Sequence, residues 1–220
     1  MTSFIVSCDA VKRVPEENYL LSKNSIFVNE KKENSETINN LLYQKPNSKI
    51  IGLGIPLRLH IYNLARPNID SILNANLDKR PNKRSNLESF LSKKQLNKYI
   101  DSRKGFNNWL KNTGESPVII NEDRTKKSIK RLNDYYINNG WFNVQSSYEI
   151  NKKKKQRAEI DYYVNTGEPY ILDSISKKKE SSMVDSLYRM IEKKAFIKKG
   201  EQYKTTNFQQ ERDRIATELR

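Results

Sequence analysis

The chain has 220 residues and a formal net charge of +15, with 35% hydrophobic and 30% charged residues. This length allows one or two domains with a core, and the excess of basic residues predicts a surface that attracts nucleic acid, lipid headgroups or acidic proteins. One cysteine excludes an internal disulfide, one histidine argues against a histidine-based metal site or catalytic base, and no window approaches the roughly 18 apolar residues of a membrane helix.

The first eighteen residues predict a processing segment followed by a tether. Phe4–Ser7 is an apolar run that ends in a small residue directly before Cys8, as at the end of a bacterial lipoprotein signal, in which the cysteine becomes lipidated. Only seven residues precede Cys8 and none is basic, so a working signal is not present here: either Met1 is a start within the signal or the chain is truncated. The alternative is an ordinary free thiol near a chain terminus. Residues 9–18 are polar and contain Pro15, which is typical of a tether.

The next segment predicts extended structure and then a short helix. Tyr19–Leu21 and Ile26–Val28 are apolar and flank a polar triplet, which favours either an extended pair or one kinked strand. Asn34-Ser35 offers a helix N-cap, and the apolar residues at 38–42 form a short helical stripe that ends at Lys45-Pro46-Asn47.

Residues 50–66 are the most apolar part of the chain, and their pattern favours a helix from Pro56 onward. Gly52-Leu53-Gly54 lacks the third glycine and the strand-to-helix setting of a dinucleotide-binding loop. Residues 67–104 contain prolines and many Asn and Lys residues, which predicts a loosely packed insertion with one helix near 85–100. A further short amphipathic helix is predicted around Phe106, Trp109 and Leu110.

Residues 124–172 carry the most informative pattern. Ile129, Leu132 and Tyr136 recur at helical spacing before the Asn139-Gly140 stop, which predicts a helix over 124–140. Apolar and polar residues then alternate over 143–151 and 156–165 on either side of a lysine-rich turn, which predicts a hairpin with one buried face. The buried sets are Val144, Ser146, Tyr148 and Ile150, then Ala158, Ile160, Tyr162 and Val164. We expect the helix to pack on this hairpin and residues 19–29 to pair into the same sheet.

An internal repeat indicates a second, incomplete module. Ile129 follows Gly114-Glu115 by fifteen residues from the glycine, and Ile215 follows Gly200-Glu201 at the same spacing. The second copy predicts a strand over 170–175 and a helix with apolar positions at Val184, Leu187, Ile191 and Phe196, and it stops at Arg220 before any hairpin.

The order strand, helix, Gly-Glu linker, helix, Gly-aromatic corner and hairpin resembles the POTRA domain of outer-membrane assembly factors. Nearly the whole chain is similar to the start of the lipoprotein branch of the BamA/TamA family, called TamL. The motifs that carry the resemblance are Cys8, Val14-Pro15-Glu16, Tyr19-Leu20-Leu21, Lys45-Pro46-Asn47, Ile61-Tyr62-Asn63, Gly114-Glu115-Ser116-Pro117-Val118, Gly140-Trp141-Phe142, Gly167-Glu168-Pro169-Tyr170 and Gly200-Glu201.

The resemblance implies an α+β fold built from a β-α-α-β-β module, with a small three-stranded sheet covered by helices. Residues 1–18 would be the truncated signal and tether, and 19–168 a first POTRA module with a helical insertion at about 50–105. Residues 169–220 would open a second module. The membrane barrel of the family would lie downstream of this chain.

The resemblance also implies a binding function without an enzyme activity, a cofactor, a metal or a catalytic residue. The chain would act at the periplasmic face of the outer membrane of a Gram-negative cell, anchored by lipid on Cys8, in protein assembly or translocation. Its partners would be unfolded outer-membrane protein clients, an inner-membrane-anchored TamB-like protein and anionic lipid headgroups. Clients would add a strand to a sheet edge formed by Asn143, Val144, Gln145, Ser146, Ser147, Tyr148 and Glu149.

Two other interpretations remain open. The basic charge and the aromatic residues on strands suit a nucleic-acid-binding α+β module, although Tyr148 and Tyr162 fall on the apolar face. Glu159, Asp161 and Asp173 with Lys177-Lys178 faintly resemble a metal-dependent nuclease, but the acid-x-Lys element of such sites is missing.

Overall fold

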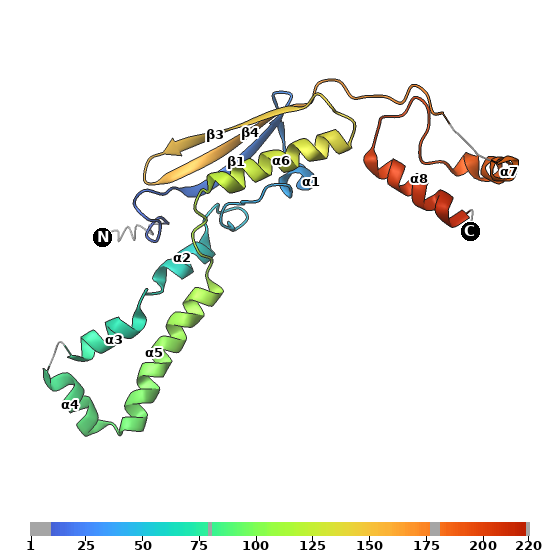
Figure 1. Cartoon of the computed structure of the whole chain (residues 1–220). Coiled ribbons are helices and arrows are strands. Elements are labelled where there is room, and N and C mark those ends of the chain that lie inside the picture. Colours follow the sequence, from blue (N-terminus) through green and yellow to red (C-terminus); the bar gives the residue numbers. More distant parts are fainter. Residues whose placement is uncertain (1–9, 79–80, 177–180, 219–220) are drawn as a thin grey trace. The chain divides into compact units, whose positions relative to one another are not determined.

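The computed structural model describes residues 10–78, 81–176 and 181–218 (Figure 1). These residues form a four-stranded sheet and eight α-helices, which confirms the predicted α+β class. The chain divides into two compact units. One contains the residues up to Lys23 with Lys45–Ile120 and Lys152–Glu159, and the other contains Asn24–Gln44, Asn121–Asn151 and the chain from Ile160 onward.

The sheet has the strand order β2-β1-β4-β3, and its strands are β1 (Leu20–Val28), β2 (Lys31–Glu33), β3 (Gln145–Lys153) and β4 (Arg157–Asn165). β1 is one continuous strand that lies beside β4, so the expected pairing of residues 19–29 into this sheet is confirmed. The expectation of three strands was wrong. Asn29 and Glu30 both have positive φ, which suits a tight hairpin turn, and the turn brings Lys31 opposite Val28.

Helix α6 (Glu122–Asn138) covers one face of the sheet (Figure 1), as its apolar stripe predicts. The Asn121 side chain caps its start by accepting the Arg124 N–H at 3.0 Å. The helix buries Thr125, Ser128, Leu132 and Tyr136, and β4 buries Ile160, Tyr162 and Val164 in the same unit. Both sets follow the period of their element, 3.6 and 2 residues respectively, so the main core of this unit is readable from local sequence. The short helix predicted before Lys45 is also present, as α1 (Glu36–Asn39), but it spans a single turn.

Four helices form a helical arm in the other unit: α2 (Leu57–Leu64), α3 (Ile69–Asp78), α4 (Pro81–Phe90) and α5 (Lys93–Thr113) (Figure 1). α2 begins directly after Pro56, as predicted. The expectation of a loose insertion with one helix near 85–100 was wrong, since α5 alone has 21 residues and includes the separate short helix expected around Phe106. Ser92 and Gln95 form a capping box that starts α5, and its buried side chains Leu96, Asn107 and Leu110 lie on one face. The buried asparagine and the many lysines conceal this periodicity in the sequence.

The C-terminal segment contains α7 (Ser182–Ile191), the 3₁₀ helix η1 (Glu192–Lys194) and α8 (Thr205–Glu218). The strand predicted over 170–175 was wrong: in the part of the segment that the structure describes, only an isolated bridge joins Ile171 to Gln202. The backbone bonds around the bridge extend from Tyr170 to Leu172, which is too short for a ladder. The predicted helix also ends at Ile191, before Phe196.

Candidate functional site

Strand β3 lies at the edge of the sheet, as the predicted strand-addition site requires. Its half-buried side chains connect it to α6: the Ser146 hydroxyl donates to Asn133 at 2.8 Å, and the Tyr148 hydroxyl donates to Glu122 at 3.0 Å. These contacts use side chains on one face of the strand. The main-chain groups on its outer side have no neighbouring strand among the described residues, so they can bond an added strand.

The structure places five of the seven predicted edge residues in this strand. Gln145–Glu149 belong to β3, whereas Asn143 and Val144 precede it in the turn that follows α6. The Asn143 amide instead contacts the Tyr170 hydroxyl at 3.4 Å. The alternation of exposure predicted for the strand is present over 145–150. The strand continues to Lys153, which is beyond the predicted edge.

Charge stabilises the contact between β3 and α6. The pKa of the Glu122 carboxyl is lowered by its hydrogen bond with Lys126 and then by the Tyr148 hydroxyl. The pKa of the Tyr148 hydroxyl is raised by burial and by the same carboxylate. At neutral pH the pair is therefore a neutral phenol that donates to a carboxylate, and Lys126 lies 3.1 Å from that carboxylate. This arrangement holds the edge strand without using its main chain.

A groove of about 960 Å³ lies on the sheet face opposite α6, beside the start of β3. Phe27 of β1 and Tyr163 of β4 stack there with ring centroids 5.4 Å apart, and Tyr163 is 40% exposed. The residues around the rings are Asn29, Glu30, Gln145, Ser147, Asn165, Gly167 and Glu168. The groove was not predicted, although Tyr163, an aromatic residue at a polar position of the alternation over 156–165, was a visible signal. It could accept the side chains of a segment bonded to β3.

Two carboxylates act on the Tyr163 hydroxyl. The pKa of Tyr163 is raised by burial and then by Asp161 and Glu149.

Five of the motifs that carry the resemblance lie in one unit, and backbone and asparagine hydrogen bonds join three of them. Asn47 is buried, and its side chain donates to Ser116 at 2.7 Å and accepts from the Val118 N–H at 3.0 Å. The Leu21 N–H donates to Val118, and the Ile120 N–H donates to Tyr19. The motif residues here are thus structural, because they attach the linker before α6 to the start of β1.

The remaining motifs of this group surround the same linker. An added Cβ at Gly114 would lie 2.5 Å from the backbone nitrogen of Tyr62, so only glycine allows the linker to approach α2. Asn63 donates to Ala10 at 3.2 Å, and the Gln156 side chain donates to the carbonyls of Pro15 and Glu16.

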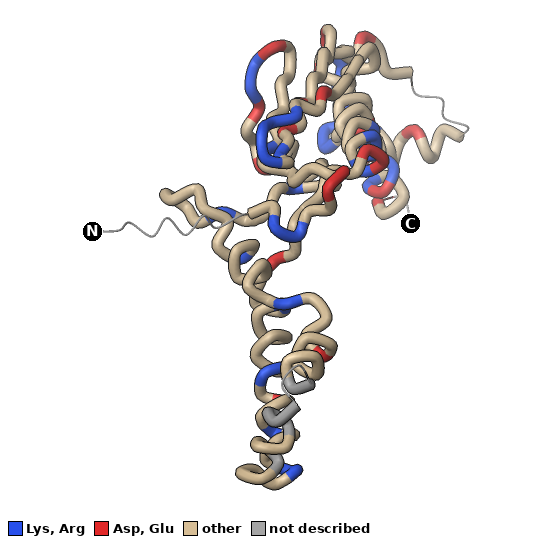
Figure 2. Tube along the Cα trace, turned by 90° about the vertical axis from the view of Figure 1, so that its left-hand side faces the viewer, with Lys and Arg blue, Asp and Glu red and all other residues tan. Residues whose placement is uncertain are grey.

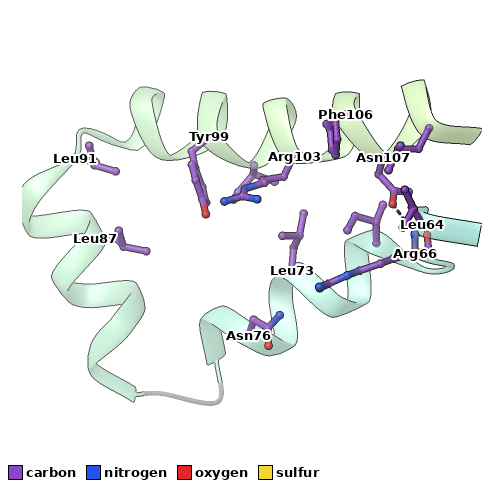
Figure 3. Close-up of a pocket in the computed structure, with 13 residues that line it drawn as sticks. Leu64, Arg66, Leu73, Asn76, Leu87, Leu91, Tyr99, Arg103, Phe106 and Asn107 are labelled. Carbon is purple, nitrogen blue, oxygen red and sulfur yellow. Dashed lines mark hydrogen bonds between the residues drawn. The ribbon is translucent and has the colours of Figure 1, made fainter. Parts of the chain in front are cut away.

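A second cavity, of about 700 Å³, lies inside the helical arm (Figure 3). Most of its lining is apolar, and two arginines, Arg66 and Arg103, contribute to it. No motif in the sequence indicated this cavity, because its walls come from several helices, of which α3 was not predicted and α4 and α5 were predicted with other bounds.

The residues of the other hypotheses are not gathered into a catalytic site. Glu159 lies 3.7 Å from Lys153 in an ion pair, and Asp161 accepts from Asn151 at 2.8 Å. Within 10–78, 81–176 and 181–218, no group of three or more acidic, His or Cys residues could hold a metal ion. Cys8 and Lys177-Lys178 lie outside the described residues. Among the described helices, none has the length and apolar character to cross a membrane.

Comparison with known proteins supports the POTRA resemblance. Residues 85–167 match the POTRA family model, described as surface antigen variable number repeat. The match begins in α4 and ends just after β4, so it contains α6, the edge strand β3 and most of the groove-lining residues. No curated protein and no solved structure matches the chain. The match supports a POTRA domain at residues 85–167, a type of module that occurs in periplasmic regions of outer-membrane proteins and binds clients or partner proteins.

Proposed function

We propose that this chain is a client-binding region of an outer-membrane assembly or translocation factor of the BamA/TamA family, in its TamL-like lipoprotein branch. Clients, which are unfolded outer-membrane proteins, add a strand to β3 by main-chain pairing. The observation that carries the proposal is the position of β3: it is an edge strand, held to α6 by Ser146 and Tyr148 and bordered by a groove with an exposed aromatic pair.

Main-chain pairing also explains how one site can accept many clients. The added strand contributes N–H and C=O groups that every sequence has, so affinity depends weakly on client side chains. Outer-membrane strands alternate apolar and polar side chains. The stacked Phe27 and Tyr163 next to the edge offer a place for an aromatic or apolar side chain of such a strand.

We further propose the module boundaries and the anchor that the resemblance implies. Residues 19–168 are the first POTRA module, residues 169–220 open a second one, and lipid on Cys8 holds the region at the periplasmic face of the outer membrane. A TamB-like protein anchored in the inner membrane is a second partner.

Anionic lipid headgroups are the third proposed partner, and the loop that leads into α2 supports this contact. Residues 50–57 expose Ile51 by 99% and Leu53 by 68%. The backbone N–H groups of Ile50, Leu53, Gly54 and Leu57 all bond within the loop. Apolar side chains on a loop with internally bonded donors can enter the headgroup boundary at low cost. Residues 37–69 contain four Lys or Arg residues and no Asp or Glu, although the Glu115 carboxylate does bond Ser48 nearby.

The edge proposal is tested by photo-crosslinkers placed singly along 143–151 and along 156–165 in the chain with a bound client. We expect adducts from β3 positions and few from β4, which lies between β1 and β3. Adducts from β4 alone, or from neither arm, would show that this edge is the wrong surface. A gel shift with DNA or RNA that weakens as salt is added, and that reports a higher affinity than the chain has for its client, would favour the nucleic-acid hypothesis instead.

A further inference from the structure

The helical arm contains an apolar cavity that the proposed client site does not use. Its volume is about 700 Å³, and it opens between α3 and α4 on one side and α5 on the other (Figure 3). Leu73 of α3, Leu87 of α4 and Leu91 in the turn between α4 and α5 direct their side chains toward it, facing Tyr99 and Phe106 on α5. The apolar wall is completed by Leu64, Ile69, Ile100 and Leu110.

Among the described residues that line this cavity, the charged side chains are Arg66 and Arg103, and none of the others is Asp or Glu. The Arg103 guanidinium lies 5.3 Å from the centre of the Tyr99 ring, and Figure 3 shows both arginine side chains reaching into the opening. The nearby Asp70 carboxylate is paired with Lys104. In the described part of the chain, neither guanidinium forms an ion pair with a carboxylate.

The backbone beside Arg66 is fixed. The Arg66 N–H donates to the Asn107 side chain at 2.7 Å, and the Asn107 amide donates back to the Arg66 carbonyl at 3.1 Å. Asn107 is only 4% exposed. This reciprocal pair attaches the segment between α2 and α3 to α5, so Arg66 enters the cavity from a defined position.

Size and charge together identify the chemistry of an occupant. Pockets for small ligands have volumes of about 300–1,000 Å³, and this cavity lies inside that range. A linear hydrocarbon chain fits the apolar walls, and an anionic head fits two guanidinium groups, which bind carboxylates and phosphates by forked hydrogen bonds.

We propose that this cavity binds a single-chain anionic amphiphile, with the acyl chain against the leucines of α3 and α4 and the head between Arg66 and Arg103. The site lies in the helical arm and goes beyond the proposed client function, so it stands whether or not β3 accepts clients. A fatty acid and a lysophospholipid share this chemistry, and the experiment distinguishes them by their heads.

The test measures binding to the full chain by calorimetry, with each probe below its micellar concentration. The probes are palmitate, 1-palmitoyl-lysophosphatidylglycerol, hexadecanol and hexadecyltrimethylammonium. We expect one site that prefers one or both anionic probes over hexadecanol and the cation. Equal binding of palmitate and hexadecanol, or no binding of either anionic probe, would overturn the proposal, as would an acidic amphipathic peptide that binds where both anionic probes fail.

Variants locate the site. Arg66→Gln with Arg103→Gln should weaken binding of the preferred anionic probe by about tenfold or more, the value of a lost charged hydrogen bond, and leave hexadecanol unaffected. Leu73→Trp should fill the cavity and weaken all probes. Arg131→Gln is the matched control, because its guanidinium also lies over a tyrosine ring, 4.1 Å from the centre of Tyr43, but on α6. Circular dichroism checks folding, and unchanged anion binding by the folded double arginine variant would exclude this site.

Discussion

Gly114 shows how a single residue can be required by space alone. It follows α5 with φ of −71°, a value open to any residue. An added Cβ would nevertheless lie 2.7 Å from the Leu110 carbonyl oxygen and from Tyr62 Cα. All of these neighbours are backbone atoms, which cannot move aside as a flexible side chain can.

Gly114→Ala should therefore lower the free energy of unfolding by about 1–3 kcal/mol, as overpacking does. Urea titration followed by circular dichroism measures this. Gly105→Ala is the control: it lies within α5 with nothing within 4 Å of an added Cβ, and it should raise stability by up to about 1 kcal/mol. Equal stability of Gly114→Ala and the unmodified chain would contradict the close approach.

Tyr136 makes stability dependent on pH in the alkaline range. Burial raises its pKa from 10.0 to about 12. The raised value favours the neutral phenol in the folded state, so this contribution is complete below pH 10 and is lost as the pH rises toward 12.

Tyr136→Phe should accordingly lose stability less steeply between pH 10 and 12 than the unmodified chain, with a difference of at most about 1.4 kcal/mol per pH unit. Urea titrations at several pH values in this window measure the slope. A Tyr136→Phe slope identical to that of the unmodified chain would refute the assignment.

At the scale of elements, β3 contacts α6 through its side chains, while the main-chain groups on its outer side have no neighbouring strand among the described residues. Proline has no N–H and cannot complete a ladder. We expect one of two double proline substitutions, either at positions 145 and 149 or at positions 144 and 148, to weaken client binding while the chain stays folded. The other set should reduce stability, since N–H groups that point toward β4 are needed by the sheet. Client crosslinking and thermal melts of both variants show which set of N–H groups points outward. If both variants fold and crosslink to the client as well as the unmodified chain does, β3 is not the client edge.

The loop at 50–57 is the element for which we predict lipid contact. Ile51→Ser with Leu53→Ser should reduce co-sedimentation with phosphatidylglycerol vesicles, because two exposed apolar side chains no longer enter the headgroup boundary. Phe90→Ser, at a residue of α4 that is 88% exposed, is the matched control and should have little effect. The measurement uses Cys8→Ser protein, so a lipid anchor cannot contribute. An equal loss of co-sedimentation in both variants would indicate nonspecific hydrophobic adsorption and not a defined contact.

At the scale of the whole molecule, the net charge of +15 is distributed. Figure 2 shows lysines and arginines on the helical arm and around the sheet, interspersed with acidic residues. A distributed basic surface speeds the approach of acidic clients and anionic headgroups without defining one site. Specific binding must therefore come from local features: the edge of β3, the groove with Phe27 and Tyr163, and the cavity of the arm.

Lipidation of Cys8 is a prediction about the protein in its native cell. The native chain should yield an acylated Cys8 at its N-terminus in mass spectrometry, and Cys8→Ala should release it from the membrane fraction. Urea-washed membranes separate this anchor from the weaker loop contact, which should not survive the wash. Recovery of an unmodified N-terminal segment that contains Cys8 would disprove the anchor.

The sequence by itself determined the elements in which the spacing of apolar residues can be recognised within the element. The alternation over 145–165 and the helical spacing of Leu132 and Tyr136 predict the hairpin and α6, because each residue reports one face of its own element. The edge position of β3 came from the family resemblance, since strand order does not leave a local pattern. The resemblance also led to the POTRA domain that the family match supports.

Only the tertiary structure decided the features that need distant residues to meet. Asn47 and Ser116 are 69 positions apart, so their hydrogen bond has no signal in either segment. The groove joins Phe27 of β1 to Tyr163 of β4, and the arm cavity needs α3, α4 and α5 at once. Local sequence predicts which face of an element is apolar, but partner choice depends on long-range packing, which places Arg66 and Arg103 in one cavity.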